Sequence, residues 1–263
     1  MGLAMDLQAG YATNPGSTIT ALTPSPNDSF VVKSFSPSAN AYLEQLIRGG
    51  AETGLIRVRS PLMHDYVQGI RFSCPAGGSG NLLGQLVNQP LYTQDTLVVE
   101  VTGATSGSDV GVIGIYYTDL GGASARLAMP GDISGRVRNI VGLEVDVTSS
   151  ATIGTWADAA LTVTEDVLRA NTDYAVLGWL CNTSLTAVAL RGPDTSNLRV
   201  GGPGPSSIYF TGEYFVRMSE RTGLPHIPII NSANKGGTYI SCVHYAASTA
   251  IAVTLIMAEL RPA

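Results

Sequence analysis

The sequence is short of charged side chains. Only 13% of its 263 residues are Asp, Glu, Lys or Arg, whereas roughly 25% is typical of a soluble domain. Lysine is the scarcest, since only Lys33 and Lys235 are present. A surface this poor in charge favours burial against another protein surface. The alternative is that Ser, Thr, Asn and Gly supply the surface polarity, as they do in monomeric β-proteins.

A basic tract is also missing. The net charge is −5, and the arginines are scattered along the chain, as Arg57, Arg59, Arg136 and Arg138 illustrate. A protein that neutralises many phosphates needs clustered Lys and Arg, because counterion release grows with the number of contacts. Extensive direct contact with nucleic acid is therefore not expected.

Cysteines are few and widely separated. Cys74, Cys181 and Cys242 are odd in number and include no CxxC pair, so neither a disulfide framework nor a zinc site is indicated. Each lies within an apolar run. We interpret all three as small buried hydrophobic residues.

Residue patterns that carry catalysis or bind cofactors are absent. His64, His226 and His244 fit no HExxH or other metal-ligand spacing, and we interpret them as structural or surface residues. Neither GxSxG nor GxxxxGK[ST] occurs, and the glycines of residues 77–84 miss the GxGxxG spacing, which favours a flexible loop there. Glu144 and Asp146 share one strand face and are not opposed as acid and base. We therefore predict no catalytic, cofactor-binding or metal-binding residue, no cofactor and no enzymatic activity.

Long hydrophobic runs are absent too. The longest, Ala250 to Ala258, falls far short of the ~20 residues that span a bilayer. Met1 to Gly10 has no cationic stretch ahead of an apolar region, so no secretory signal is expected. We expect no membrane insertion, while apposition to an internal membrane stays open.

What the sequence does contain is a period of two, which is typical of strands. In Ile140 to Thr148, apolar residues alternate with polar ones. Three pairs of such runs are predicted to form hairpins, in Asp95 to Leu120, Tyr174 to Arg191 and Thr238 to Glu259. About eight long strands in two sheets predict an all-β jelly-roll sandwich. Weak runs around Leu127, Leu161 and Ile208 leave a compact double jelly roll as the alternative.

The N-terminal part is predicted to differ from the rest. Residues 1–36 are rich in Gly, Pro, Ser, Thr and Asn and are expected to form an extended arm, followed by one sandwich domain over 37–263. A short helix is predicted over Ala39 to Arg48, where apolar residues follow helical spacing before two glycines. A second helix candidate, Trp156 to Leu168, is interrupted by a β-rich stretch and stays ambiguous.

Buried positions and contact segments follow from this scheme. The long connection from Gly192 to Pro205 is rich in Pro and Gly, and long ordered loops often carry contacts. The residues expected to form the sandwich core include Phe72, Val99, Val145, Trp179 and Val253.

This layout resembles the jelly-roll capsid proteins of tailless icosahedral viruses, including bacteriophages. The similarity lies in the arm, the short helix, the large loops and two strand pairs: DTLVVEVTGATSGSDVGVIGIYYTDL (Asp95 to Leu120) and YISCVHYAASTAIAVTLIMAEL (Tyr239 to Leu260). It implies a coat subunit of the virion, assembled in the host cytoplasm, whose arm and loops bind copies of itself and other virion proteins. Small RNA virus capsid proteins often add a basic arm. Its absence here points to a shell kept apart from its genome.

A binding module is the competing interpretation. A trimeric spike, a fibre head or a lectin-like sandwich uses the same fold to recognise a receptor or a carbohydrate. Exposed aromatic residues in a groove would favour it. The candidates are Tyr92, Tyr116, Tyr117, Tyr209 and Tyr214.

Overall fold

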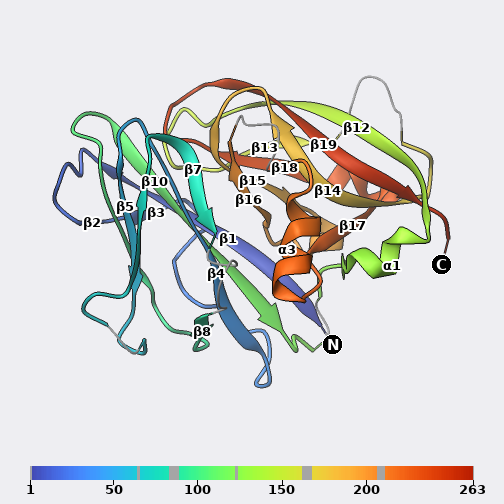
Figure 1. The fold of residues 1–263 in the computed structure, drawn as a ribbon, viewed down its shortest axis with the longest axis horizontal. Helices are drawn as coiled ribbons and strands as arrows, with labels where there is room; N and C mark the ends of the chain where they lie inside the picture. The colour runs from blue at the N-terminus through green and yellow to red at the C-terminus, as the bar shows by residue number, and fades with distance from the viewer. Residues whose placement is uncertain are drawn as a thin grey trace.

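The computed structural model describes most of the chain, namely residues 2–63, 66–82, 89–121, 124–161, 168–205 and 211–262. These residues are mainly β, as predicted, and their strands form four antiparallel sheets (Figure 1). Two sheets come from the N-terminal half of the chain and two from the C-terminal half. No helix among the described residues is long and apolar enough to cross a membrane.

The N-terminal half contains sheets 1A and 1B. Sheet 1A has the order β3-β1-β10-β4-β7, with β8 also paired to β4, and sheet 1B has the order β2-β9-β5-β6. The bounds are β1 Leu3–Thr13, β2 Thr20–Ala21, β3 Thr23–Pro24, β4 Asn40–Gly50, β5 Gly54–Arg59, β6 Ile70–Cys74, β7 Gly77–Leu82, β8 Gln89–Leu91, β9 Val98–Thr102 and β10 Ser108–Thr118.

The C-terminal half contains sheets 2A and 2B. Sheet 2A has the order β11-β17-β14-β19-β12, and sheet 2B has the order β13-β18-β15-β16. The strands are β11 Leu127–Ala128, β12 Val137–Thr148, β13 Ala157–Ala160, β14 Asp173–Cys181, β15 Leu185–Arg191, β16 Val200–Gly204, β17 Ile227–Asn231, β18 Tyr239–Val243 and β19 Ala250–Leu260. The helices are α1 Pro130–Ser134 and α3 Tyr214–Thr222, with 3-10 turns η2 Pro193–Thr195 and η3 Ser232–Gly237.

Both halves have the wiring of a jelly roll. If the main strands of each half are lettered B to I in chain order, the sheets read B-I-D-G and C-H-E-F in both halves. This is the pairing of two interlocked Greek keys. The jelly-roll prediction is confirmed, in the form of its alternative, the compact double jelly roll.

The three predicted hairpins are wrong, although their strands are present. β9 and β10 lie in different sheets, as do β14 and β15, and β18 and β19. A short turn can join two paired strands, but it can equally join strands of two sheets that pack about 10 Å apart. Alternation along a strand does not show which strand is its partner. Each predicted hairpin is instead a crossing between the two sheets of one jelly roll.

The helix predicted over Ala39 to Arg48 is wrong, because this segment is strand β4 in the middle of sheet 1A. The register of β4 against β10 shifts between Leu43 and Gln45, so Glu44 forms a bulge. Leu43 and Leu46 then face the same core although they are three residues apart. The bulge therefore imitates the spacing of a helix face.

The segment expected to be an extended arm contains a central strand. β1 lies between β3 and β10 and pairs with β10 along its whole length. Both faces of β1 are buried, and a Cβ at Gly10 would meet the ring of Phe30 and the carbonyl of Thr23. The small residues that favoured an arm instead allow close packing on both faces.

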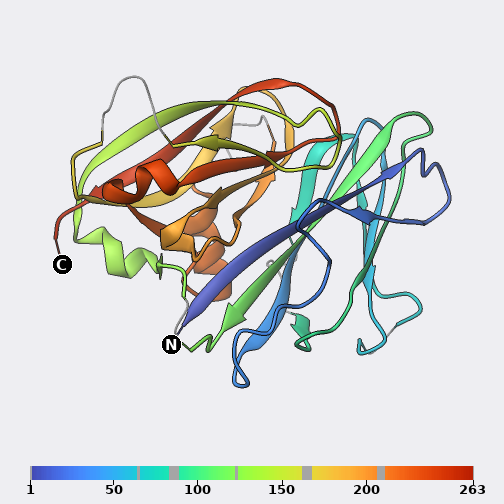
Figure 2. The same cartoon turned by 180° about the vertical axis from the view of Figure 1, so that it is seen from behind.

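Sheet 1A is covered on both sides. One face packs against sheet 1B around Ile56, Val99 and Ile113. The other face joins Leu7 and Val112 to the core of the second jelly roll. The two halves lie side by side, with sheet 1A toward the second half (Figures 1 and 2).

The core predictions agree with this packing. Val99, Val145, Trp179 and Val253 are buried, while Phe72 is half-buried against the first core. In the ambiguous segment Trp156 to Leu168, residues 157–160 form β13, and residues 162–167 lie outside the described part of the chain. Residues 77–82 of the glycine-rich stretch interpreted as a flexible loop form strand β7, paired to β4, and residues 83 and 84 lie outside the described part of the chain.

Candidate functional site

The junction between the two jelly rolls holds a buried ionic pair. Glu44, at the bulge of β4, places Oε1 2.6 Å from Nε2 of His226, which follows α3, and both side chains are at most 1% exposed. His226 Nδ1 lies 2.9 Å from the Leu224 carbonyl oxygen, to which it donates. Burial opposes the charged imidazole, but the Glu44 carboxylate and these hydrogen bonds outweigh it and raise the pKa of His226. The buried Glu44–His226 hydrogen bond thus joins the two halves.

Neutral hydrogen bonds reinforce the junction. Gln45 Nε2 donates to the Gly201 carbonyl over 3.1 Å, and the Tyr116 hydroxyl donates to the Pro225 carbonyl over 2.8 Å. The Leu7 amide donates to the Arg199 carbonyl over 2.9 Å. Buried polar groups satisfied in this way fix one relative orientation.

The connection from Gly192 to Pro205 therefore has a partner within its own chain. Its strand β16 packs on sheet 1A, and Arg199 NH1 binds Asp28 Oδ1 over 2.8 Å. Asp28 Oδ2 also accepts from the Trp156 indole over 2.8 Å. These contacts lie between the two jelly rolls of one chain, and the contacts that the sequence predicted between copies stay a prediction.

A second buried ion pair lies inside the first jelly roll. Arg48 NH2 and Asp109 Oδ1 are 2.7 Å apart, and both side chains are fully buried. Asp109 Oδ2 also accepts from the Ala104 amide over 2.8 Å. Gly103 has φ +147° and lies so close that a Cβ there would collide with the Arg48 guanidinium. The turn that joins β9 to β10 is therefore built around this pair.

The tyrosines considered for a binding groove do not form one among the described residues. Tyr116, Tyr117 and Tyr214 are buried, whereas Tyr92 is exposed. Tyr209 lies outside the described part of the chain. Tyr116, Tyr117 and Tyr214 instead pack in the hydrophobic cores. Tyr116 also donates a hydrogen bond at the junction.

The other candidate residues are dispersed. His64 lies outside the described part of the chain, and His244 is buried, which lowers its pKa. Glu144 and Asp146 are exposed on β12. Within the described ranges, no group of three or more His, Cys, Asp or Glu residues could hold a metal ion.

The cysteines are free thiols, as interpreted from the sequence. Cys74, Cys181 and Cys242 are all buried. Burial raises the pKa of the Cys181 thiol to about 12, and burial is also the main reason that the pKa of Cys242 rises to about 12.

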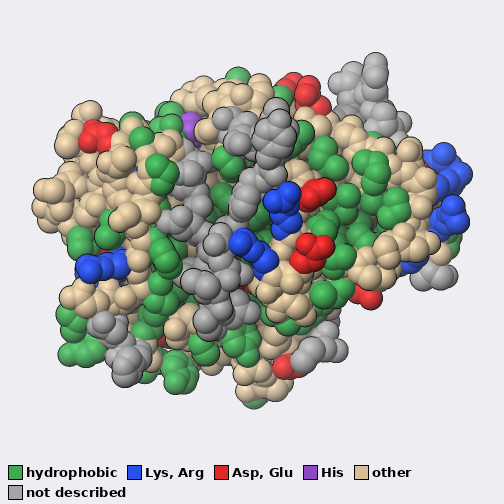
Figure 3. All heavy atoms as spheres, in the orientation of Figure 1, with side chains coloured by type: hydrophobic (Ala, Val, Ile, Leu, Met, Phe, Trp, Pro, Cys, Tyr) green, Lys and Arg blue, Asp and Glu red, His purple; other side chains and the backbone are tan. Residues whose placement is uncertain are grey.

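Exposed hydrophobic side chains gather at one end of the first jelly roll. Leu62, Tyr66, Val67 and Tyr92 are 54 to 62% exposed. They come from the β5–β6 loop and from the segment after β8. A hydrogen bond from Ser60 Oγ to Asp95 Oδ2, over 2.5 Å, joins these two segments. Green side chains mark this end in the lower left of Figure 3. We call these four residues the apolar tip.

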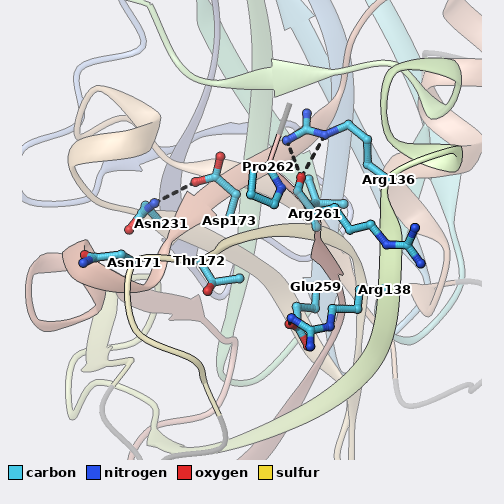
Figure 4. Close-up of a pocket in the computed structure, with 10 residues that line it drawn as sticks. Arg136, Arg138, Asn171, Thr172, Asp173, Asn231, Glu259, Arg261 and Pro262 are labelled. Carbon is cyan, nitrogen blue, oxygen red and sulfur yellow. Dashed lines mark hydrogen bonds and ion pairs between the residues drawn. The ribbon is translucent and has the colours of Figure 1, made fainter.

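A pocket at the far end of the second jelly roll collects arginines that are scattered in the sequence. It measures about 540 Å³ and lies where β12 begins and β19 ends (Figure 4). Arg136 donates from Nε and NH2 to the carbonyl of Arg261, at 3.2 and 3.0 Å. Arg138 NH1 lies 3.5 Å from Glu259 Oε1, and Arg169 Nε lies 3.1 Å from the same oxygen. We call this site the arginine pocket.

The arginine pocket leaves no signal in the sequence, because its residues meet only through strand pairing. Val137 pairs with Leu260 in the antiparallel register of β12 and β19. Residues more than a hundred positions apart therefore share one sheet end. Lys and Arg side chains gather at the same end in Figure 3, next to the C-terminus.

Comparisons with known proteins give only weak similarities. No family model and no curated protein matches the chain. Among solved structures, the STIV MCP is 10% identical with a TM-score of 0.21, over 100% of this chain and 98% of that one. The major capsid protein P2 from bacteriophage PM2 is 8% identical with a TM-score of 0.20, over 98% of both chains. The infectious bursal disease virus VP2 subviral particle is 11% identical with a TM-score of 0.14, over 99% and 80%.

Similarity at this level carries no argument about function. The double jelly roll described above rests on the strand pairings of this chain alone.

Proposed function

We propose that this chain is a structural shell subunit that assembles with copies of itself into a viral capsid. The observation that carries the proposal is the fusion of two jelly rolls of identical wiring into one block. Jelly rolls are a common architecture of viral coat domains. Two of them in one chain provide a broad, rigid building unit for a closed surface.

The junction supports this role. The Glu44–His226 pair and the contacts of β16 on sheet 1A hold both halves in one orientation. A shell subunit needs a fixed shape, because small angular errors repeat at every contact of a closed assembly. Buried polar groups that hydrogen-bond to each other across the junction provide such specificity.

The surface supports it as well. With 13% charged residues, the chain has few side chains that oppose association. The apolar tip offers a place for a second copy, since exposed apolar patches mark interaction sites. Copies of the chain and other virion proteins are the partners in this proposal, and the virion is its location. Extensive nucleic-acid contact, membrane insertion and catalysis have no part in it.

The full chain should be tested by size-exclusion chromatography with negative-stain microscopy. Closed shells or large ordered sheets are expected. Discrete trimers with no larger species would favour a spike or a fibre head, and a monomer at every concentration would overturn the proposal.

A further inference from the structure

We propose that the arginine pocket binds a phosphate group. The proposal does not depend on the shell role, because it rests only on charges and donors within one chain.

The pocket and its rim carry more positive than negative charge. Glu259 is 3% exposed and lies between Arg138 and Arg169, so one carboxylate faces two guanidinium groups. Arg136 and Arg261 line the same pocket. Arginine stays protonated in proteins, so these charges persist across the physiological pH range.

The other carboxylate of the pocket, Asp173, is paired with Arg126, a guanidinium outside the pocket that also lies 3.4 Å from Asp194 Oδ1. Asp173 Oδ2 lies 2.6 Å from Arg126 NH2, and Asp173 Oδ1 accepts from Asn231 Nδ2 over 2.8 Å. The Arg126 guanidinium and the hydrogen bond from Asn231, opposed in part by burial, hold the pKa of Asp173 below its usual range. The four arginines of the pocket and its rim therefore outnumber its two carboxylates, Glu259 and Asp173.

The positions of the guanidinium groups leave donors for a ligand. Arg136 uses Nε and NH2 on the Arg261 carbonyl, and no described residue accepts from its NH1. Arg138 and Arg169 are 51 and 55% exposed. Figure 4 shows Arg136, Arg138 and Arg261 on one side of the pocket, opposite Asn171 and Thr172.

These features fit phosphate better than a carboxylate. A phosphate group presents more oxygens than a carboxylate does, so more than one guanidinium fork can bind it at once. The pocket volume of about 540 Å³ exceeds the ~30 Å³ share of one water many times. It therefore admits a hydrated phosphate, either as a free ion or as the headgroup of a lipid.

Isothermal titration calorimetry of the full chain with inorganic phosphate, at constant ionic strength, tests the proposal. We expect saturable binding that the Arg138→Gln/Arg261→Gln variant weakens at least about tenfold. The matched control is Arg217→Gln, which removes an equally exposed arginine of α3, 3.4 Å from Glu213, and should bind phosphate like the unmodified chain. Circular dichroism and thermal melting establish that both variants are folded.

Equal binding by the double variant and the unmodified chain, or no saturable binding, would overturn the proposal. Flotation with phosphatidylglycerol vesicles then identifies the source of the phosphate. Flotation that the double variant loses and added phosphate competes away indicates a lipid headgroup, while calorimetric binding without flotation indicates the free ion. Since shell formation is scored separately by microscopy, failure here would leave the proposed function standing.

Discussion

Glu44 Oε1 and His226 Nε2 lie 2.6 Å apart although 182 positions separate them in the chain. The pair joins a strand bulge of the first jelly roll to the residue that precedes β17 of the second. This link between the two halves is deeply buried, because both side chains are at most 1% exposed. The stability of the block should therefore depend on pH through this pair.

The pH dependence has a definite sign. The pKa of His226 is higher in the folded chain than its unfolded value of about 6.5. The stabilisation is therefore complete below about pH 6.5 and is lost as the pH rises through the folded-state pKa. Urea unfolding followed by tryptophan fluorescence, repeated across this range, should show it.

Replacing His226 tests the pair itself. His226→Gln should lower the free energy of unfolding by about 3–5 kcal/mol near pH 6, because it leaves Glu44 as a buried charge without a partner. Glu44→Gln/His226→Gln should recover part of the loss. His244→Gln is the control, because the pH dependence of this histidine has the opposite sign. Burial lowers the pKa of His244, so the stability that the neutral imidazole contributes is lost as the pH falls. A His226→Gln variant with unchanged stability and pH dependence would show that the pair does not join the halves.

The Arg48–Asp109 pair gives a second prediction. Asp109→Asn should cost about 3–5 kcal/mol, because the fully buried guanidinium loses its counter-charge. Arg48→Met/Asp109→Leu should cost less than Asp109→Asn, since no charge stays buried. Urea midpoints measure both. A double variant less stable than the single one would contradict this account of the pair.

The central position of β1 gives a third prediction. Leu7→Ala should lower the free energy of unfolding by about 2–5 kcal/mol, because Leu7 is fully buried. Leu62→Ala, in the apolar tip, should change it by no more than about 0.5 kcal/mol. Deleting residues 1–30 should abolish folding, as judged by circular dichroism. A folded deletion variant would restore the arm interpretation.

Several strand positions could be predicted from the sequence, but the partners of those strands could not. Alternation in Ile140 to Thr148 located β12 correctly. The jelly-roll crossings follow from which sheet each strand joins, and the turns after β9, β14 and β18 carry no mark of that choice. Helical spacing at Leu43 and Leu46 was misleading, because a bulge adds one residue between two inward positions.

Neither the Glu44–His226 pair nor the arginine pocket could be predicted from the sequence. His226 stood as an isolated residue in the sequence, and only the packing of α3 and its following loop on sheet 1A brings it to Glu44. Arg136 and Arg261 likewise meet through the pairing of β12 with β19. Buried cysteines were predictable, because each lies within an apolar run.

The apolar tip gives a fourth prediction. Leu62→Asp/Tyr92→Asp should reduce assembly in microscopy and sedimentation while leaving the melting temperature unchanged, because both side chains are exposed. Ile19→Asp is the control, since it places the same charge on an exposed residue of another loop. Equal assembly by the unmodified chain, the double variant and the control would show that the apolar tip does not contact other copies.

The thiols give a fifth prediction. Burial is the main reason that the pKa values of Cys181 and Cys242 rise to about 12. The thiolate is the reactive form of cysteine. A thiol reagent at about pH 8 should therefore label neither residue in the folded chain, and both after unfolding in urea. Rapid labelling of native protein would place at least one thiol at the surface.

Cryo-electron microscopy of particles formed by the full chain tests the central claim most directly. The account predicts closed shells in which every subunit shows two sandwiches side by side, with the Glu44–His226 junction closed and contacts made between protein surfaces. Preparations that hold only monomers, or shells in which the two sandwiches of one subunit separate, would contradict it.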